Sequence, residues 1–226
     1  MKFTWFGHAS FSLEMGGKQL VFDPFITPNE QAKSIDVNAI PADYVLLSHG
    51  HADHVADAEA ILTRTGATLI SNYEIVSWYG EKGIENAWPM NHGGKHQFDF
   101  GTVRYVNAVH SSVLPDGTYG GNPGGFIIEA DGRRIYYAGD TALHMDMELI
   151  GRYWKPDLAI LPIGDNFTMG IEDAIICCDM IQCDKVIGVH YNTFPFINID
   201  SALAKKAFAK AGKELILPGI GESKEV

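Results

Sequence analysis

The stretch His49-Gly50-His51-Ala52-Asp53-His54 decides how the rest of this sequence is interpreted. Four of its six side chains are imidazoles or a carboxylate, which are donor types that hold Zn²⁺ and similar first-row metal ions. An apolar run, 44–47, comes before it, and a helical pattern follows it. Because a strand fixes the segment while a loop lets its side chains converge, the stretch predicts a metal site at a strand end.

Three more donor-type residues follow predicted strands. His110 follows the strand 103–109, Asp140 follows 135–138 after one glycine, and His190 follows 186–189. In a layered α/β domain, the strand ends along one edge of the sheets lie close together. We therefore expect four separate strands to deliver their donors to a common rim.

Short strands alternate with helices along the whole chain. Strands are predicted at 3–6, 11–14, 20–22, 44–47, 103–109, 126–129, 135–138, 158–161 and 186–189, and helices at 55–65, 73–79, 144–153, 171–181 (capped by Thr168) and 201–211. Residues 43–51 resemble 157–165, and residues 20–23 resemble 135–140. This weak repeat favours a duplicated two-sheet domain. Because no linker separates the halves, we expect one domain over 1–226.

Composition and charge narrow the class of protein. The 226 residues are 46% hydrophobic and 20% charged, which is typical of a folded globular domain. A chain of this length buries enough surface to fold without a metal, so a metal here would be functional. There is no apolar run long enough to span a bilayer and no signal-peptide pattern, so we expect a cytoplasmic protein. The net charge of −11 disfavours a nucleic-acid partner.

These residues resemble the hallmark of the metallo-β-lactamase superfamily, an H-x-H-x-D-H loop with a later His, Asp and His. The resemblance covers nearly the whole chain. The opening Trp5-Phe6-Gly7-His8-Ala9-Ser10-Phe11 and the turn Phe22-Asp23-Pro24 are similar to a branch of uncharacterised bacterial metal-dependent hydrolases. That branch is akin to ascorbate-phosphate lactonases and N-acyl-phosphatidylethanolamine phospholipases. The resemblance implies an α/β fold, a four-layered αββα sandwich built from two similar halves.

The resemblance also implies a binuclear metal site. One ion would be held by His49, His51 and His110, and the second by Asp53, His54 and His190, with Asp140 bridging both. Two divalent ions are expected, with zinc first and manganese, nickel or iron as alternatives. A hydroxide shared by the ions would attack a small ester, lactone, amide or phosphoester. Asp53 is the predicted catalytic residue, because it can orient that hydroxide or relay its proton.

Other polar residues are predicted to support this site. Asp23 is expected to hydrogen-bond the outer nitrogen of a ligand histidine and so fix its tautomer. His8 and Asn192 are expected to back up a ligand or to contact substrate. Asp165, Asn166 and Tyr191 are further candidates for lining the pocket, and the glycine-rich loop 114–125 is expected to form its rim or a lid.

Two alternative functions remain at this point. The first is a metal-dependent nuclease or phosphodiesterase, although no basic arm is visible. The second is a di-iron redox protein on the same fold. The resemblance gives that redox branch a carboxylate where this sequence has His51, and a flavin domain that has no counterpart here. The sequence leaves the physiological substrate and the oligomeric state open.

Overall fold

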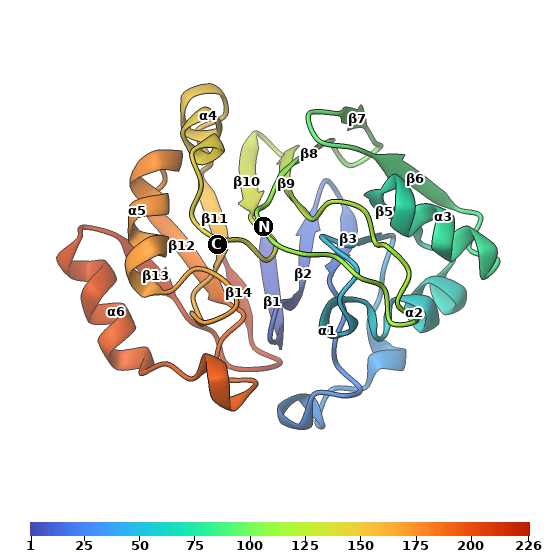
Figure 1. Ribbon diagram of the computed structural model, residues 1–226, viewed down its shortest axis with the longest axis horizontal. Helices are drawn as coiled ribbons and strands as arrows, with labels where there is room; N and C mark the ends of the chain where they lie inside the picture. The colour runs from blue at the N-terminus through green and yellow to red at the C-terminus, as the bar shows by residue number, and fades with distance from the viewer.

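The strands, including every predicted one, pair into two sheets of seven strands that pack face to face (Figure 1). The structure is a computed structural model and describes residues 1–226. The first sheet, in spatial order, contains β14 (Ser223–Glu225), β1 (Lys2–Gly7), β2 (Ser10–Met15), β3 (Lys18–Phe22), β4 (Tyr44–Leu46), β5 (Thr68–Asn72) and β6 (Ala87–Met90). The second contains β7 (Lys95–Gln97), β8 (Thr102–Asn107), β9 (Gly124–Ala130), β10 (Arg133–Tyr137), β11 (Leu158–Pro162), β12 (Lys185–Val189) and β13 (Glu214–Ile216).

Both sheets have the same pairing pattern. In the first, β14 through β3 pair antiparallel and β3 through β6 pair parallel. In the second, β7 through β10 pair antiparallel and β10 through β13 pair parallel. The similar sequence segments fall on equivalent strands, namely β3 with β10 and β4 with β11. The fold is therefore the predicted α/β sandwich of two similar halves.

Helices cover the outer face of each sheet (Figure 1). They are α1 (Ala52–Val55), α2 (Ala58–Thr65), α3 (Tyr73–Glu81), α4 (Asp146–Tyr153), α5 (Ile171–Ile181) and α6 (Ser201–Lys210). In Figure 1 the first three flank the blue-to-green sheet, and the last three flank the yellow-to-red sheet. This gives the order helix, sheet, sheet, helix that the resemblance implies. No helix has both the length and the apolar character that crossing a bilayer requires.

The helix predicted at 55–65 is in fact two helices, because the chain breaks at Ala56 and Asp57. The buried carboxylate of Asp57 accepts hydrogen bonds from the backbone N–H groups of Ile26 and Thr27, at 2.6 and 2.9 Å. The Asp57 N–H itself donates to the carbonyl of Pro24. These bonds to a distant loop replace the helical ones. As a result, the one-turn helix α1 carries Asp53 and His54 apart from α2.

Most other boundaries shift by one or two residues, and the contacts explain two of the differences. The cap of α5 is Gly170 rather than Thr168, whose hydroxyl donates to the carbonyl of Met169. Strand β8 ends at Asn107 rather than Val109, because the Val109 N–H donates to Thr141 and leaves the ladder. Five short strands were not predicted from the sequence. Polar residues interrupt their apolar pattern, or they lie toward the edges of the sheets. These strands are β5, β6, β7, β13 and β14.

Aromatic side chains fill the space between the sheets next to the strand ends. Phe11 of β2 stacks on Phe22 of β3, with ring centroids 4.5 Å apart. Tyr137 of β10 meets Phe11 edge-on from the opposite sheet at 4.9 Å. All three rings are fully buried. This packing fixes the distance between the two sheets where Asp23 and Asp140 leave β3 and β10.

Candidate metal centre

The carboxylate of Asp140 lies among four histidine side chains. Its Oδ2 atom is 3.0 Å from the Nε2 of His190 and 3.3 Å from that of His54. The Nε2 atoms of His110 and His49 lie 3.6 and 3.9 Å from the same oxygen. These five residues come after four different strands, β4, β8, β10 and β12, so the common rim expected from the sequence is present in the fold.

Besides the set formed by Asp23 with His49 and His54, the donor atoms fall into two groups, each with its atoms within 4.8 Å of one another. The first donor group is His49, His51 and His110. The second donor group is His8, Asp53, His54 and His190. All seven residues predicted as ligands are thus brought together. The second group also includes His8, which the sequence placed outside the ligand set.

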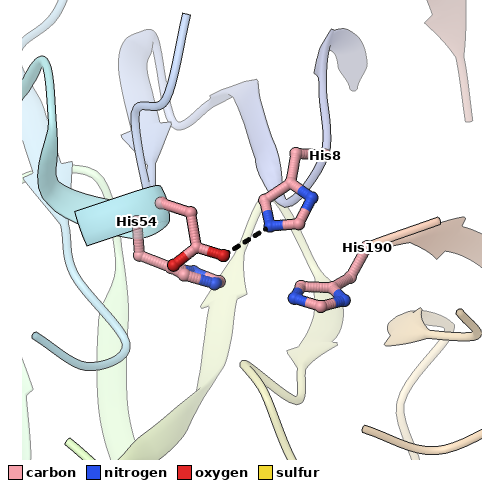
Figure 2. A group of neighbouring side chains, drawn as sticks. His8, His54 and His190 are labelled. Atoms are coloured by element: carbon pink, nitrogen blue, oxygen red, sulfur yellow. Dashed lines mark hydrogen bonds and ion pairs between the residues drawn. The ribbon is translucent and has the colours of Figure 1, made fainter. Parts of the chain in front are cut away.

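His8 holds Asp53 through a hydrogen bond between its Nε2 and Oδ2, 3.1 Å apart (Figure 2). Burial, with a further effect from His190, lowers the pKa of His8 to about 4, so its ring is neutral. Burial tends to raise the pKa of Asp53, but the bond from His8 and the charge of His54 hold it well below its usual range. Because a carboxylate only accepts, Nε2 of His8 carries the proton, and Nδ1 accepts from the hydroxyl of Thr193 at 3.0 Å.

Asp23 is a fully buried hub behind the centre. Its Oδ1 accepts from the Ser48 N–H at 2.7 Å, and its Oδ2 accepts from the Ser48 hydroxyl at 2.5 Å. The same Oδ2 accepts from the Tyr137 hydroxyl at 2.6 Å and lies 2.9 Å from Nδ1 of His54. The contact with a predicted ligand histidine is the one expected of Asp23. Ser48 and Tyr137 were missed, since a serine and a strand tyrosine carry no signal of this role in the sequence.

This hub fixes the tautomers of two histidines. His54 donates from Nδ1 to Asp23, which leaves its Nε2 directed at Asp140. The single hydroxyl proton of Ser48 goes to Asp23, so Ser48 Oγ accepts from Nδ1 of His49 at 2.9 Å. His49 therefore also presents an Nε2 atom to Asp140. In metal sites, such outer hydrogen bonds orient ligand histidines.

Three buried polar atoms at the centre have no hydrogen-bond partner: Nε2 of His54, Nδ1 of His190 and Oδ1 of Asp140. Buried polar atoms in proteins nearly always have a partner, so these atoms indicate a missing one. Burial lowers the pKa of His54, but Asp140 and Asp23 outweigh it and raise the pKa well above its usual range. A cation bound at Nε2 would take the place of that proton. The nitrogen and oxygen donors, with no thiolate, fit Zn²⁺ and related first-row ions.

Three residues at the centre have left-handed backbones, namely His8 (φ 52°), Asp23 (φ 40°) and His190 (φ 55°). Such conformations are unfavourable for residues other than glycine and gather at functional sites. The His190 N–H donates to the carbonyl of His8 at 2.9 Å, which ties the end of β12 to the turn after β1. The strain is thus held by a contact between the two sheets.

The other predicted residues lie around this centre. The Asn192 side chain accepts from the Ile199 N–H at 2.7 Å, so its amide oxygen holds a loop. Tyr191 is buried and stacks on Trp5 with centroids 5.2 Å apart, so its side chain packs in the core beside the centre. The predicted rim loop 114–125 is tied to the centre through the Gly124 N–H, which donates to the carbonyl of Ser48 at 3.0 Å. Just before that loop, the Ser111 hydroxyl lies 3.2 Å from Nε2 of His51. Asp165 and Asn166 line a neighbouring cleft.

Comparisons with known proteins agree with this geometry. The family model of the beta-lactamase superfamily domain matches residues 2–190. A UPF0173 metal-dependent hydrolase of Flavobacterium johnsoniae is 58% identical over 226 residues, covering 100% of both chains. One from Christiangramia forsetii is 56% identical over 227 residues, also covering 100% of both. The solved structure of Igni18, a metallo hydrolase from Ignicoccus hospitalis, is 36% identical with a TM-score of 0.90, covering 100% of this chain and 98% of that one. The chain therefore belongs to the UPF0173 metal-dependent hydrolases of the beta-lactamase superfamily.

Proposed function

We propose that this chain binds two divalent metal ions, with zinc as the expected ion, and hydrolyses a small ester, lactone or phosphoester. The first donor group would hold one ion. Asp53, His54 and His190 of the second donor group would hold the other, and Asp140 would bridge them. His8 would serve Asp53 as a hydrogen-bond donor rather than bind metal, because its Nε2 proton is directed at that carboxylate.

One observation carries the proposal. The Oδ2 atom of the buried Asp140 has four imidazole Nε2 atoms at distances between 3.0 and 3.9 Å. A buried charge is stable only when it is paired or coordinates a metal. For His49 and His54, the outer nitrogens are already occupied by Ser48 and Asp23. The nitrogens that remain are directed inward, as cation binding requires.

When bound, the ions would lower the pKa of a coordinated water and polarise the substrate oxygen. Asp53 is ionised at neutral pH, and its Oδ2 is engaged by His8, so Oδ1 is the atom left to face the ion and to orient the attacking water. His8 keeps that carboxylate in place and, being neutral, adds no positive charge beside it. No nucleophilic side chain is needed.

Exposure indicates where the substrate enters. His51, Asp53 and His110 are partly exposed, whereas His49, His54, His190 and Asp140 are buried. A substrate would therefore approach over the exposed three and meet the Asp53 carboxylate at the entrance. A small-molecule substrate agrees with this geometry and with the net charge of −11. The cytoplasmic location and the single domain stay predictions from the sequence.

Metal analysis combined with activity assays tests the proposal. The chain is purified without chelator or nickel affinity resin, its metals are counted by elemental mass spectrometry, and hydrolysis of a short ester, a simple lactone and a generic phosphodiester is measured. We expect close to two zinc or manganese ions and turnover of at least one compound. Two irons without hydrolysis would favour the redox alternative. No bound metal after reconstitution would contradict the site.

A further inference from the structure

The ring of His51 lies between another histidine and a serine hydroxyl. Its Nδ1 atom is 2.9 Å from Nε2 of His49, and its Nε2 atom is 3.2 Å from Oγ of Ser111. Ser111 is exposed and directly follows His110 in the chain. The sequence pattern does not single it out, and the proposed function gives it no role. Its contact with a histidine of the first donor group therefore needs an explanation of its own.

The contact with His49 identifies the nitrogen of His51 that would face an ion. The proton of His49 is on Nδ1, which donates to Ser48, so Nε2 of His49 is free to bind a cation. Zinc–nitrogen bonds are about 2.0–2.1 Å long, so two nitrogens 2.9 Å apart are close enough to bind one ion. Nδ1 of His51 would therefore bind that ion, and Nε2 would be its outer nitrogen.

The outer nitrogen of a ligand histidine needs a hydrogen-bond acceptor. A ligand histidine is neutral, so the nitrogen that does not bind metal carries the proton. An acceptor on that N–H group keeps the ring in one tautomer and one orientation. Oγ of Ser111 is at hydrogen-bonding distance from Nε2 of His51, and a hydroxyl oxygen can accept. Ser111 thus occupies the position that this acceptor must have.

The backbone that carries Ser111 is bonded to the loop 49–54 through the next residue. The hydroxyl of Ser112 accepts from the Gly50 N–H at 3.1 Å and donates to the carbonyl of Gly120 at 2.8 Å. The Gly120 N–H donates to the Ser112 carbonyl at 3.2 Å. Ser112 is buried, and Gly50 directly precedes His51. These bonds hold Ser111 beside His51 through protein contacts alone.

Ser48 and Ser111 support their histidines to different degrees. The Ser48 hydroxyl donates to the buried carboxylate of Asp23 at 2.5 Å, and a hydroxyl polarised in this way is a better acceptor. Ser111 is exposed, so water competes for its contact with His51. Loss of the Ser111 hydroxyl should therefore have a measurable but moderate effect.

We propose that Ser111 is a positioning residue of the metal centre. Its hydroxyl accepts the Nε2 proton of His51 and so fixes the tautomer that directs Nδ1 at the ion of the first donor group. This inference rests on the proposed function, because it requires an ion at that group. Ser111 acts through His51 and binds no ion itself, so its effect is confined to one of the two ions.

Zinc affinity, measured without turnover, tests this inference. Competition of the zinc-loaded full chain with chelators of graded strength gives a dissociation constant for each ion, and His51→Ala identifies the ion of the first donor group. Ser111→Ala should weaken that ion about 10-fold, at the low end for such a partner because water can replace an exposed hydroxyl. The affinity for the other ion should not change. Ser111→Thr keeps the hydroxyl, has room for the extra methyl group and should restore the affinity.

Magnetic resonance of the histidine rings separates positioning from a general loss of structure. In the zinc-loaded chain labelled with ¹⁵N-histidine, long-range proton–nitrogen correlations distinguish the metal-bound nitrogen of each ring from the protonated one. We expect His51 to carry its proton on Nε2 in the unmodified chain and in Ser111→Thr. In Ser111→Ala that N–H signal should disappear through faster exchange with water. The Nδ1 protons of His49 and His54 should give the same signals in every variant.

Thr118→Ala is the matched control. Thr118 is also exposed and lies in the same loop between β8 and β9, and none of its hydrogen bonds involves a donor residue. This variant should keep both zinc affinities and the Nε2–H signal of His51. Thermal unfolding checks that each variant is folded.

The outcomes separate this inference from the proposed function. Unchanged zinc affinities in Ser111→Ala, or a Ser111→Thr variant as weak as Ser111→Ala, would overturn the inference and leave metal-dependent hydrolysis standing. Coordination of zinc by Nε2 of His51 would overturn it as well. A selective loss at one ion that threonine restores would support the inference even if no ester or lactone is hydrolysed, and the proposed activity alone would then be wrong. An unmodified chain that binds no zinc would contradict both.

Discussion

The two donor groups differ in how the fold holds them. In the second, His54 is buried against Asp23, and Asp53 is bonded by His8, which Thr193 bonds in turn. In the first, His51 and His110 are partly exposed, and His51 lies between His49 and the Ser111 hydroxyl of a surface loop. We therefore expect the second group to be ordered before a metal binds and the first to gain part of its order from the metal.

The contrast has a structural origin. His8, His54 and His190 meet where the two sheets are joined, and the His190 N–H bonds the His8 carbonyl across that junction (Figure 2). His51 and His110 lie toward the entrance. A shared carboxylate, Asp140, connects the two environments. Removing the Asp140 carboxylate is therefore the strongest test of the difference between the two donor groups.

Asp140→Ala should cause the largest loss. With the bridging carboxylate gone, metal content should fall from two ions toward one, and kcat/KM should drop at least about 1,000-fold, because charge stabilisation worth several kcal/mol is lost. Elemental mass spectrometry and a hydrolysis assay measure both effects. Asp146→Ala, an exposed carboxylate six residues later, should change neither. Two ions retained in Asp140→Ala would contradict the bridging role.

Asp23→Asn should weaken metal affinity about 10- to 100-fold, because the variant loses the carboxylate that fixes His54 directly and His49 through Ser48. Competition with a zinc-binding dye measures the affinity. Asp57→Asn is the matched control, since Asp57 is also buried but bonds only backbone N–H groups. If both variants weaken zinc binding equally, Asp23 acts through the fold rather than through the histidines.

Release of zinc to a chelator should be biphasic, with rates separated by about 10-fold, because the first donor group is more exposed and less supported. Stopped-flow mixing with an excess of chelator records the two phases. His51→Ala should remove the fast phase, and His54→Ala should remove the slow one. A single phase in the unmodified chain would show that the two groups do not differ in this way.

The smallest effect is expected from Tyr137→Phe. This change removes the hydrogen bond to Asp23 that joins the sheets, so the free energy of unfolding should fall by about 1.5–3 kcal/mol in urea. Tyr136→Phe is the matched control, because the adjacent Tyr136 hydroxyl is buried without a partner. Its removal should be neutral or stabilising. The reverse order would contradict the role given to the Asp23 hub.

Much of the fold could be predicted from the sequence, because buried strands are short apolar runs. The strands around β3, β4, β10, β11 and β12 and the two-sheet repeat were predicted from that pattern and are confirmed. Strands toward the sheet edges and the break before α2 were not predicted. The break depends on bonds between Asp57 and residues 26 and 27, which no local pattern reveals.

The residues of the metal centre can likewise be separated into those predicted from the sequence and those whose contacts only the structure shows. The sequence by itself named the seven residues that meet at the rim, because donor side chains after strand ends form a recognisable pattern; their role as ligands stays a prediction that metal analysis tests. Only the tertiary structure decided that Asp23 supports His54, that His8 bonds Asp53, and that Asn192 holds a loop. Those contacts join residues far apart in the chain. They depend on how the two sheets pack, and a single sequence does not encode that packing in any local spacing.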